Sequence, residues 1–209
     1  MSEEIRLRPE QLFFLGQLMG ARYIDYAYIA DMRELGRSYP YIEQGVLTEL
    51  SREGLIRKRL GGGTVVRSDV AGLLMPVFFG RLETGLEITL PQEKRAESTG
   101  FHYFNGACTM VRREGNILIL SEASFQTLRS LVLSAVGRHW ASARTIPALR
   151  QDTVQRVICA KRGVVDGEGS CLYLAEQFGG LYTTDKQDRP QAVRDEEAAQ
   201  LLLTMLKGE

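Results

Sequence analysis

The sequence has 209 residues, of which 44% are hydrophobic and 25% charged, as in an ordinary globular protein and unlike a disordered or fibrous chain. Its 26 basic residues equal its 26 acidic ones, whereas a protein that coats nucleic acid normally carries a basic excess. At this length, one domain or two closely packed units are expected.

The opening residues, MSEEI, are acidic and polar and do not have the pattern of a signal peptide. The most apolar run, residues 70–80, is too short to span a bilayer and contains Pro76. The three cysteines, Cys108, Cys159 and Cys171, have neither metal-ligand nor redox spacing. These features predict a cytoplasmic protein with reduced thiols and no membrane insertion.

The first 75 residues have the pattern of three helices followed by a β-hairpin. Apolar residues at helical spacing and glycine stop signals predict the helices, and a change of period after Gly54 predicts two short strands around a triple glycine. The expected spans are 9–20, 23–35, 42–54, 55–60 and 64–67. This succession predicts a winged-helix-like part over residues 1–75.

Residues 76–209 predict a mostly antiparallel sheet with packed helices, so the fold class is α+β. A short helix is expected to start at Ser68 and end at Pro76, because proline lacks a backbone N–H. Beyond it the expected strands, with a polar connection at 91–100, are 77–79, 86–90, 104–111, 117–120, 154–159, 171–174 and 181–184. The sequence leaves open whether the two parts are separate domains or one continuous domain.

A hairpin followed by a helix occurs twice in this region, which predicts two hairpin–helix halves. The first helix is expected after a cap at Ser121, and the second over residues 195–207 with Leu201 and Leu202 on its apolar face. Leu128 and Leu202 are expected in the core, where these helices lie on the sheet.

No residue cluster in the sequence indicates a catalytic chemistry. The two histidines, His102 and His139, each stand beside an aromatic residue without a second ligand at metal-ligand spacing. The sequence lacks a nucleophile elbow, a phosphate-binding loop and a dinucleotide fingerprint. Acidic residues 195–197 suit the dipole at a helix start. We therefore predict a non-enzymatic binding protein with no catalytic, cofactor-binding or metal-binding residues and no cofactor.

The basic residues of the hairpin, Arg57, Lys58, Arg59 and Arg67, are suited to contact DNA phosphates. The preceding helix disfavours this function, because residues 39–53 carry three acidic side chains and one basic one. A helix that enters the major groove presents Arg, Lys, Asn or Gln to the base edges. DNA binding is therefore disfavoured, and a winged-helix transcriptional regulator is the alternative function.

Four stretches of the sequence together carry a family resemblance. They are LRPEQLFFLGQLMGA, LTELSREGLIRKRLGGGTVVRSDVAGLLMP, GACTMVRREGNILILSEASFQTLRSLVLSAV and GGLYTTDKQDRPQAVRDEEAAQLLLTMLKG. They resemble the EspG family of cytosolic chaperones in type VII (ESX) secretion, or a Gram-positive relative of it. The first is similar to the family's leading helix, and the second to its leucine-rich helix and Gly-Leu stretch ending in proline. The third is similar to its strand, turn, strand and helix, and the fourth to its final strand and helix.

This resemblance implies a mixed fold with a central sheet, and a chaperone or adaptor that keeps export substrates soluble until the secretion ATPase takes them. The implied partner is a secreted helical protein of the WXG/LXG type or of the PE–PPE type.

Such a client offers an apolar helical tip, which exposed aromatic side chains can cover. We predict Phe101, Tyr103 and Phe104 as the partner-binding residues, beside a mobile polar loop at Gln92–Thr99. Alternation along the strand places Phe101 and Tyr103 outward and Phe104 inward. The alternative is that all three are ordinary core and edge aromatics.

Overall fold

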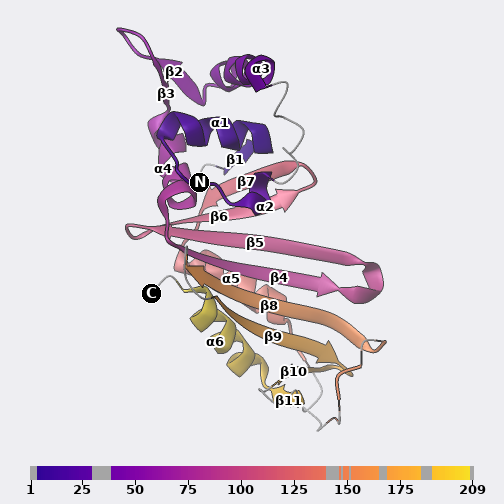
Figure 1. Ribbon diagram of the computed structural model, residues 1–209. Coiled ribbons are helices and arrows are strands. Elements are labelled where there is room, and N and C mark those ends of the chain that lie inside the picture. The colour runs from indigo at the N-terminus through magenta and orange to yellow at the C-terminus, as the bar shows by residue number, and fades with distance from the viewer. Residues whose placement is uncertain are drawn as a thin grey trace. The chain divides into compact units, whose positions relative to one another are not determined.

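The computed structural model describes residues 4–29, 39–139, 146, 148–150, 152–164, 169–184 and 190–207. The chain divides into two compact units (Figure 1). Unit 1 comprises Met1–Arg81 and His102–Glu122, and unit 2 comprises Leu82–Phe101 and Ala123–Glu209. The predicted boundary between residues 75 and 76 falls inside helix α4 (Ser68–Phe79).

The helices of unit 1 begin and end mostly where the sequence predicts. α1 (Pro9–Met19) starts with proline and ends at Gly20, whose φ of 75° is accessible to glycine at little cost. α3 (Tyr39–Arg52) confirms the third predicted helix. The second helix, predicted from residue 23, begins only at α2 (Tyr26–Ile29), and residues 30–38 lie outside the described part of the chain.

The predicted hairpin is confirmed as strands β2 (Ile56–Lys58) and β3 (Thr64–Val66), which pair antiparallel. Gly61, Gly62 and Gly63 all have positive φ between the strands, which explains the triple glycine. The helices and the hairpin follow one another in the predicted order. The description of residues 1–75 as a winged helix stays a prediction.

Helix α4 continues through Pro76 to Phe79, so the predicted helix end at Pro76 and the predicted strand at residues 77–79 are wrong. Pro76 removes one backbone hydrogen bond from the helix. Val77 and Phe78, however, are both buried in the core of unit 1. Burial of two large apolar side chains contributes more than one lost hydrogen bond costs. Tertiary packing therefore overrides the local stop signal.

The sheet of unit 1 contains β1 (Glu4–Leu7), β7 (Ile117–Glu122) and β6 (Ala107–Glu114), in that order and antiparallel. The β6–β7 turn is two residues long, and Gly115 takes its positive φ of 60°. The core draws on α1, α3, α4 and this sheet. Its most buried members are Leu7, Leu12, Leu15, Leu50, Val70, Leu74, Leu118 and Leu120.

The sheet of unit 2 has the strand order β5, β4, β8, β9, β10, β11. The strands span Arg95–Phe104, Leu82–Leu90, Val154–Val164, Ser170–Gln177, Gly180–Thr184 and Pro190–Val193, and the end of β5 from His102 belongs to unit 1. Successive pairs from β4 to β11 are antiparallel. The α+β class with a mostly antiparallel sheet is confirmed.

The polar connection predicted at residues 91–100, including the mobile loop Gln92–Thr99, is largely strand. Only a 3₁₀ turn (Pro91–Glu93, labelled η2 here) and Lys94 connect β4 to β5, which begins at Arg95. The first four side chains of β5 are all exposed. Backbone pairing with β4 holds these residues in a strand, so no apolar alternation is needed to define it.

Helices α5 (Phe125–Val136) and α6 (Asp195–Leu206) both belong to unit 2 and pack against each other. The cap of α5 is Ser124 and not Ser121, because the Ser124 hydroxyl accepts a hydrogen bond from the Thr127 N–H at 3.2 Å. Both hairpin–helix successions occur along the chain. None of the described helices is long and apolar enough to cross a membrane.

The buried face of α6 is rotated from the predicted one. Leu202 is fully buried and Leu128 on α5 is buried, both as predicted, but Leu201 is 38% exposed. The buried residues of α6 are Ala198, Ala199, Leu202, Leu203 and Leu206. At its far end the buried Thr84 hydroxyl donates to the Leu206 carbonyl at 3.1 Å, which ties the helix to β4.

Candidate partner-binding surface

The three aromatic residues predicted to bind a partner lie together near the end of β5, but Phe101 does not face solvent. Its side chain is 0% exposed, so the prediction that it points outward is wrong. Tyr103 and Phe104 are each half-buried, and the Phe104 ring packs against Phe79 with ring centroids 6.3 Å apart. Alternation in the sequence identifies the two faces of a strand, but not which of them other elements cover. The role of the three residues in partner binding stays a prediction.

Tyr103 is held in place by close neighbours. A Cβ at Gly80 would lie 2.7 Å from the Tyr103 carbonyl oxygen and 2.3 Å from that of Pro76, so only glycine allows the end of α4 to approach β5. Burial raises the pKa of the Cys108 thiol to about 11, and a hydrogen bond with the Tyr103 side chain partly offsets this shift. Tyr103 is thus a half-exposed aromatic ring on a well-supported strand.

His102, between Phe101 and Tyr103, is a packed residue. Its Nε2 lies 2.6 Å from the hydroxyl oxygen of Tyr28, and the two rings meet edge to face with centroids 5.5 Å apart. Burial lowers the pKa of His102 to about 4, and the carboxylate of Asp25 acts in the opposite direction. The imidazole is therefore neutral at pH 7, which suits a buried hydrogen bond.

This buried histidine predicts a loss of stability in mild acid. Its pKa falls from 6.5 to about 4 on folding, so between these values the unfolded chain binds more protons than the folded one. The contribution of neutral His102 to the free energy of unfolding is complete above about pH 6.5. It is lost as the pH falls toward 4, which lowers the free energy of unfolding by about 3 kcal/mol. Urea unfolding of the wild type and of His102→Gln at pH 7 and pH 4 measures it. The variant should lose less stability, and equal losses would contradict the prediction.

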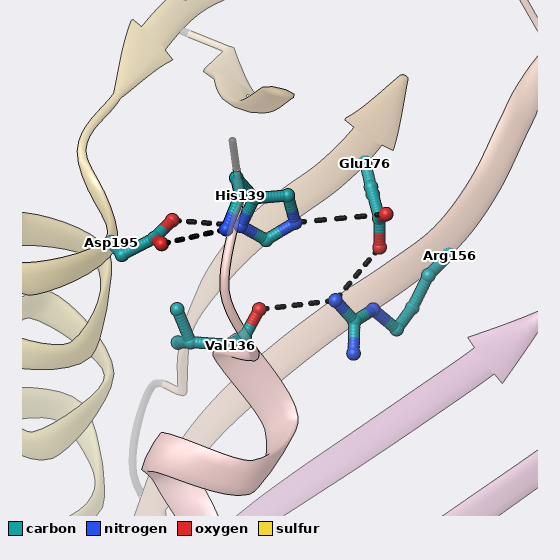
Figure 2. A network of polar contacts seen from close by, with 5 residues as sticks. All are labelled: Val136, His139, Arg156, Glu176 and Asp195. Atoms are coloured by element: carbon teal, nitrogen blue, oxygen red, sulfur yellow. Dashed lines mark hydrogen bonds and ion pairs between the residues drawn. The ribbon is translucent and has the colours of Figure 1, made fainter. Parts of the chain in front are cut away.

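A second polar cluster surrounds His139 in unit 2 (Figure 2). The His139 backbone N–H donates to Asp195 Oδ2 at 2.9 Å, and its ring Nδ1 lies 2.7 Å from Asp195 Oδ1. The other ring nitrogen, Nε2, is 3.6 Å from Glu176 Oε1. Arg156 completes the cluster by donating to Glu176 Oε2 at 2.7 Å and to the Val136 carbonyl at 3.0 Å.

This cluster connects helices and strands of unit 2, and its geometry does not suggest a catalytic or metal-binding role. Both ring nitrogens of His139 face carboxylates, so neither is turned toward a substrate or a metal. Among the described residues, no three His, Cys, Asp or Glu side chains are grouped to hold a metal ion. The cluster joins the end of α5 to the start of α6 and to β9. Sequence reasoning missed it because Asp195 and Glu176 are distant along the chain and carry no local motif.

The opposite ends of α5 and α6 also meet, so the two helices run antiparallel. The Lys207 ammonium lies 5.0 Å from the centre of the Phe125 ring. The exposed face of this pair is partly apolar, because Phe125, Leu133 and Leu201 are exposed on it. Elsewhere in the described residues, large exposed apolar side chains are Tyr23, Leu60, Met75, Tyr173 and Phe178.

Two of the acidic side chains of α3 and its end have polar partners. Glu49 forms an ion pair with Arg8, and Glu53 accepts a hydrogen bond from the Gln11 amide at 3.1 Å. Two of the three acidic side chains that argue against DNA binding are therefore bound to residues at the start of α1. The exposed polar residues of α3 and its end are Gln44, Thr48, Ser51, Arg52 and Glu53.

No protein-family model matches this sequence, and neither does any curated protein. Among solved structures, the fold matches that of the Mycobacterium tuberculosis type VII secretion system chaperone EspG5 in complex with the PE25–PPE41 dimer, with a TM-score of 0.64. The match covers 98% of this chain and 95% of EspG5, at 11% sequence identity. The chain has an EspG-like fold. At this level of identity the likeness shows the fold alone, and it confirms the fold that the sequence resemblance implies.

Proposed function

We propose that this protein is a cytosolic chaperone of type VII secretion, which binds a helical export substrate and keeps it soluble. The observation that carries this proposal is the EspG-like fold, because the match to EspG5 extends over nearly the whole of both chains. The EspG5 structure contains a PE25–PPE41 dimer, so a paired helical client of the PE–PPE type, or of the related WXG/LXG type, is the partner to test. The secretion ATPase would then take the client for export.

Within this function, we assign the client contact to Tyr103. Tyr103 and Phe104 are both half-buried, but the Phe104 ring packs against Phe79, and neither strand neighbour of Tyr103, His102 or Phe104, carries a carboxylate. A tyrosine ring buries apolar area while its hydroxyl keeps a polar partner, which suits an interface that must later open. Phe101 and Phe104 support the strand from within. A fold by itself does not establish a function, so binding of a client is the decisive test.

Co-expression with a paired helical secreted protein of the PE–PPE type should yield a complex that purifies through a tag on the chaperone. Tyr103→Asp should weaken that complex about thirtyfold, the size of a loss at an interface hot spot, because it puts a charge against an apolar tip. The matched control is Tyr173→Asp on β9, where the tyrosine is 52% exposed. It should leave the complex intact.

Affinity is measured by titration of the purified components, and folding of each variant by its thermal midpoint. Equal weakening by both tyrosine variants would place the client contact elsewhere. If the paired helical protein binds neither the wild type nor the variants, the chaperone function itself is contradicted.

A further inference from the structure

The β2–β3 hairpin with its loop, residues 56–66, is a concentrated basic surface that does not include the client contact proposed at Tyr103. Arg57, Lys58 and Arg59 are exposed in succession, and in the part of the chain that the structure describes no carboxylate or hydrogen-bond acceptor engages their side chains. At the tip, Leu60 is exposed to 107% of its reference area. We call residues 56–66 the basic hairpin.

The basic hairpin has one face turned to the core of unit 1 and one turned away. Ile56 is buried and pairs with Val66, which packs against the core, so this side faces inward. Arg57 pairs with Val65 on the other side, and alternation places Arg59 beside them. Lys58 alternates to the side of Ile56, beyond the buried part of the strand, where its side chain is exposed. The hairpin borders a hollow of about 490 Å³, lined by Arg57, Lys58, Arg59, Leu60, Val65, Val66 and Ser68.

We propose that the basic hairpin binds an acidic segment of another polypeptide, in which carboxylates flank an apolar side chain. Arg57 and Arg59 supply the charge complementarity on the outward face, with exposed Lys58 adding positive charge at the edge, and guanidinium groups pair well with carboxylates. Leu60 and Val65 beside the cations offer apolar contact that such a segment can fill. A phosphodiester backbone has no apolar group for them.

Two observations favour this partner over duplex nucleic acid. Glu53 is exposed in the turn that leads from α3 to the hairpin, and its hydrogen-bond partner Gln11 is neutral, so its negative charge would repel a continuous line of phosphates. The chain as a whole carries 26 basic and 26 acidic residues, so it lacks the long-range field that steers a polyanion. A short acidic segment needs only the local charge. The hairpin shares no residue with the client contact at Tyr103, so this proposal goes beyond the proposed function and fails or stands separately from it.

The test uses the full chain and a fluorescent peptide in which a leucine is flanked by glutamates. A second peptide, in which glutamines replace the glutamates, is the matched uncharged probe. The variant Arg57→Glu, Lys58→Glu, Arg59→Glu reverses the charge of the hairpin. The control Arg22→Glu, Arg81→Glu, Arg129→Glu makes the same charge change at three other exposed positions. A third variant, Leu60→Ser, removes the apolar tip. Fluorescence anisotropy gives each Kd, and a fluorescent DNA duplex is titrated in parallel.

Hairpin reversal should weaken binding of the glutamate peptide roughly tenfold, the size that three exposed ion pairs supply together, while the control stays within about twofold. Binding should also weaken with salt, and Leu60→Ser should lower affinity severalfold. Three results overturn the proposal: equal binding of the glutamate and glutamine peptides, equal losses in the hairpin and control variants, or tighter binding of the duplex than of the peptide. Thermal midpoints of all variants should match that of the wild type, because these side chains are exposed. If the hairpin variant unfolds, the affinity of the Leu60→Ser variant tests the proposal in its place, and an unchanged Kd for the glutamate peptide overturns it.

Discussion

Replacing Phe101 by alanine should lower the free energy of unfolding by about 3–5 kcal/mol. The side chain is 0% exposed and is among the largest fully buried side chains of the molecule. Its removal forfeits the burial of a whole aromatic ring and leaves a cavity that a strand backbone cannot collapse to fill. Phe101→Asp should be worse, because it buries an unpaired carboxylate and the protein then fails to fold.

Tyr103→Ala provides the comparison, since this ring lies two residues along the same strand and is only half-buried. Its loss should destabilise less than that of Phe101. Urea unfolding followed by circular dichroism gives both values from the midpoint and the slope. If Phe101→Ala were as mild as a surface substitution, Phe101 would be accessible in solution and would return to the set of candidate client contacts.

Leu202→Ala in α6 should lower the free energy of unfolding by about 2–5 kcal/mol, and Leu128→Ala in α5 should lower it by a similar amount. Leu202 is fully buried where α6 lies on β4, β8 and β9, and Leu128 is buried in the helix that packs beside it. Each truncation leaves a cavity between elements that are held at their ends, by Asp195 with His139 and by Lys207 with Phe125.

Leu201→Ala is the matched control, because it makes the same chemical change one residue away on the exposed side of α6. It should cost clearly less than either buried substitution, since alanine and leucine have similar helix propensities and the Leu201 side chain is already 38% exposed. Because α5 and α6 contact each other, the Leu128 and Leu202 losses should not add independently in the double variant. Near-neutral results at both buried sites would contradict the placement of the two helices.

Local signals in the sequence were sufficient for most individual elements. Pro9 and Gly20 delimit α1 because each acts through its own backbone geometry, whatever the rest of the chain does. The triple glycine and Gly115 identify turns for the same reason. The full-length likeness of helix and strand patterns also led to the EspG-like fold without any structure.

Which face of each strand or helix is buried by other segments was decided only by the tertiary structure. Pro76 is a stop signal that the burial of Val77 and Phe78 overrides, and Arg95–Phe104 is a strand because β4 pairs with it. Phe101 is buried although alternation allowed it to face outward, and Asp195 meets His139 although nothing in the sequence between them indicates it. Turn and cap signals act over a few residues, whereas burial and ion pairing depend on segments that only folding brings together.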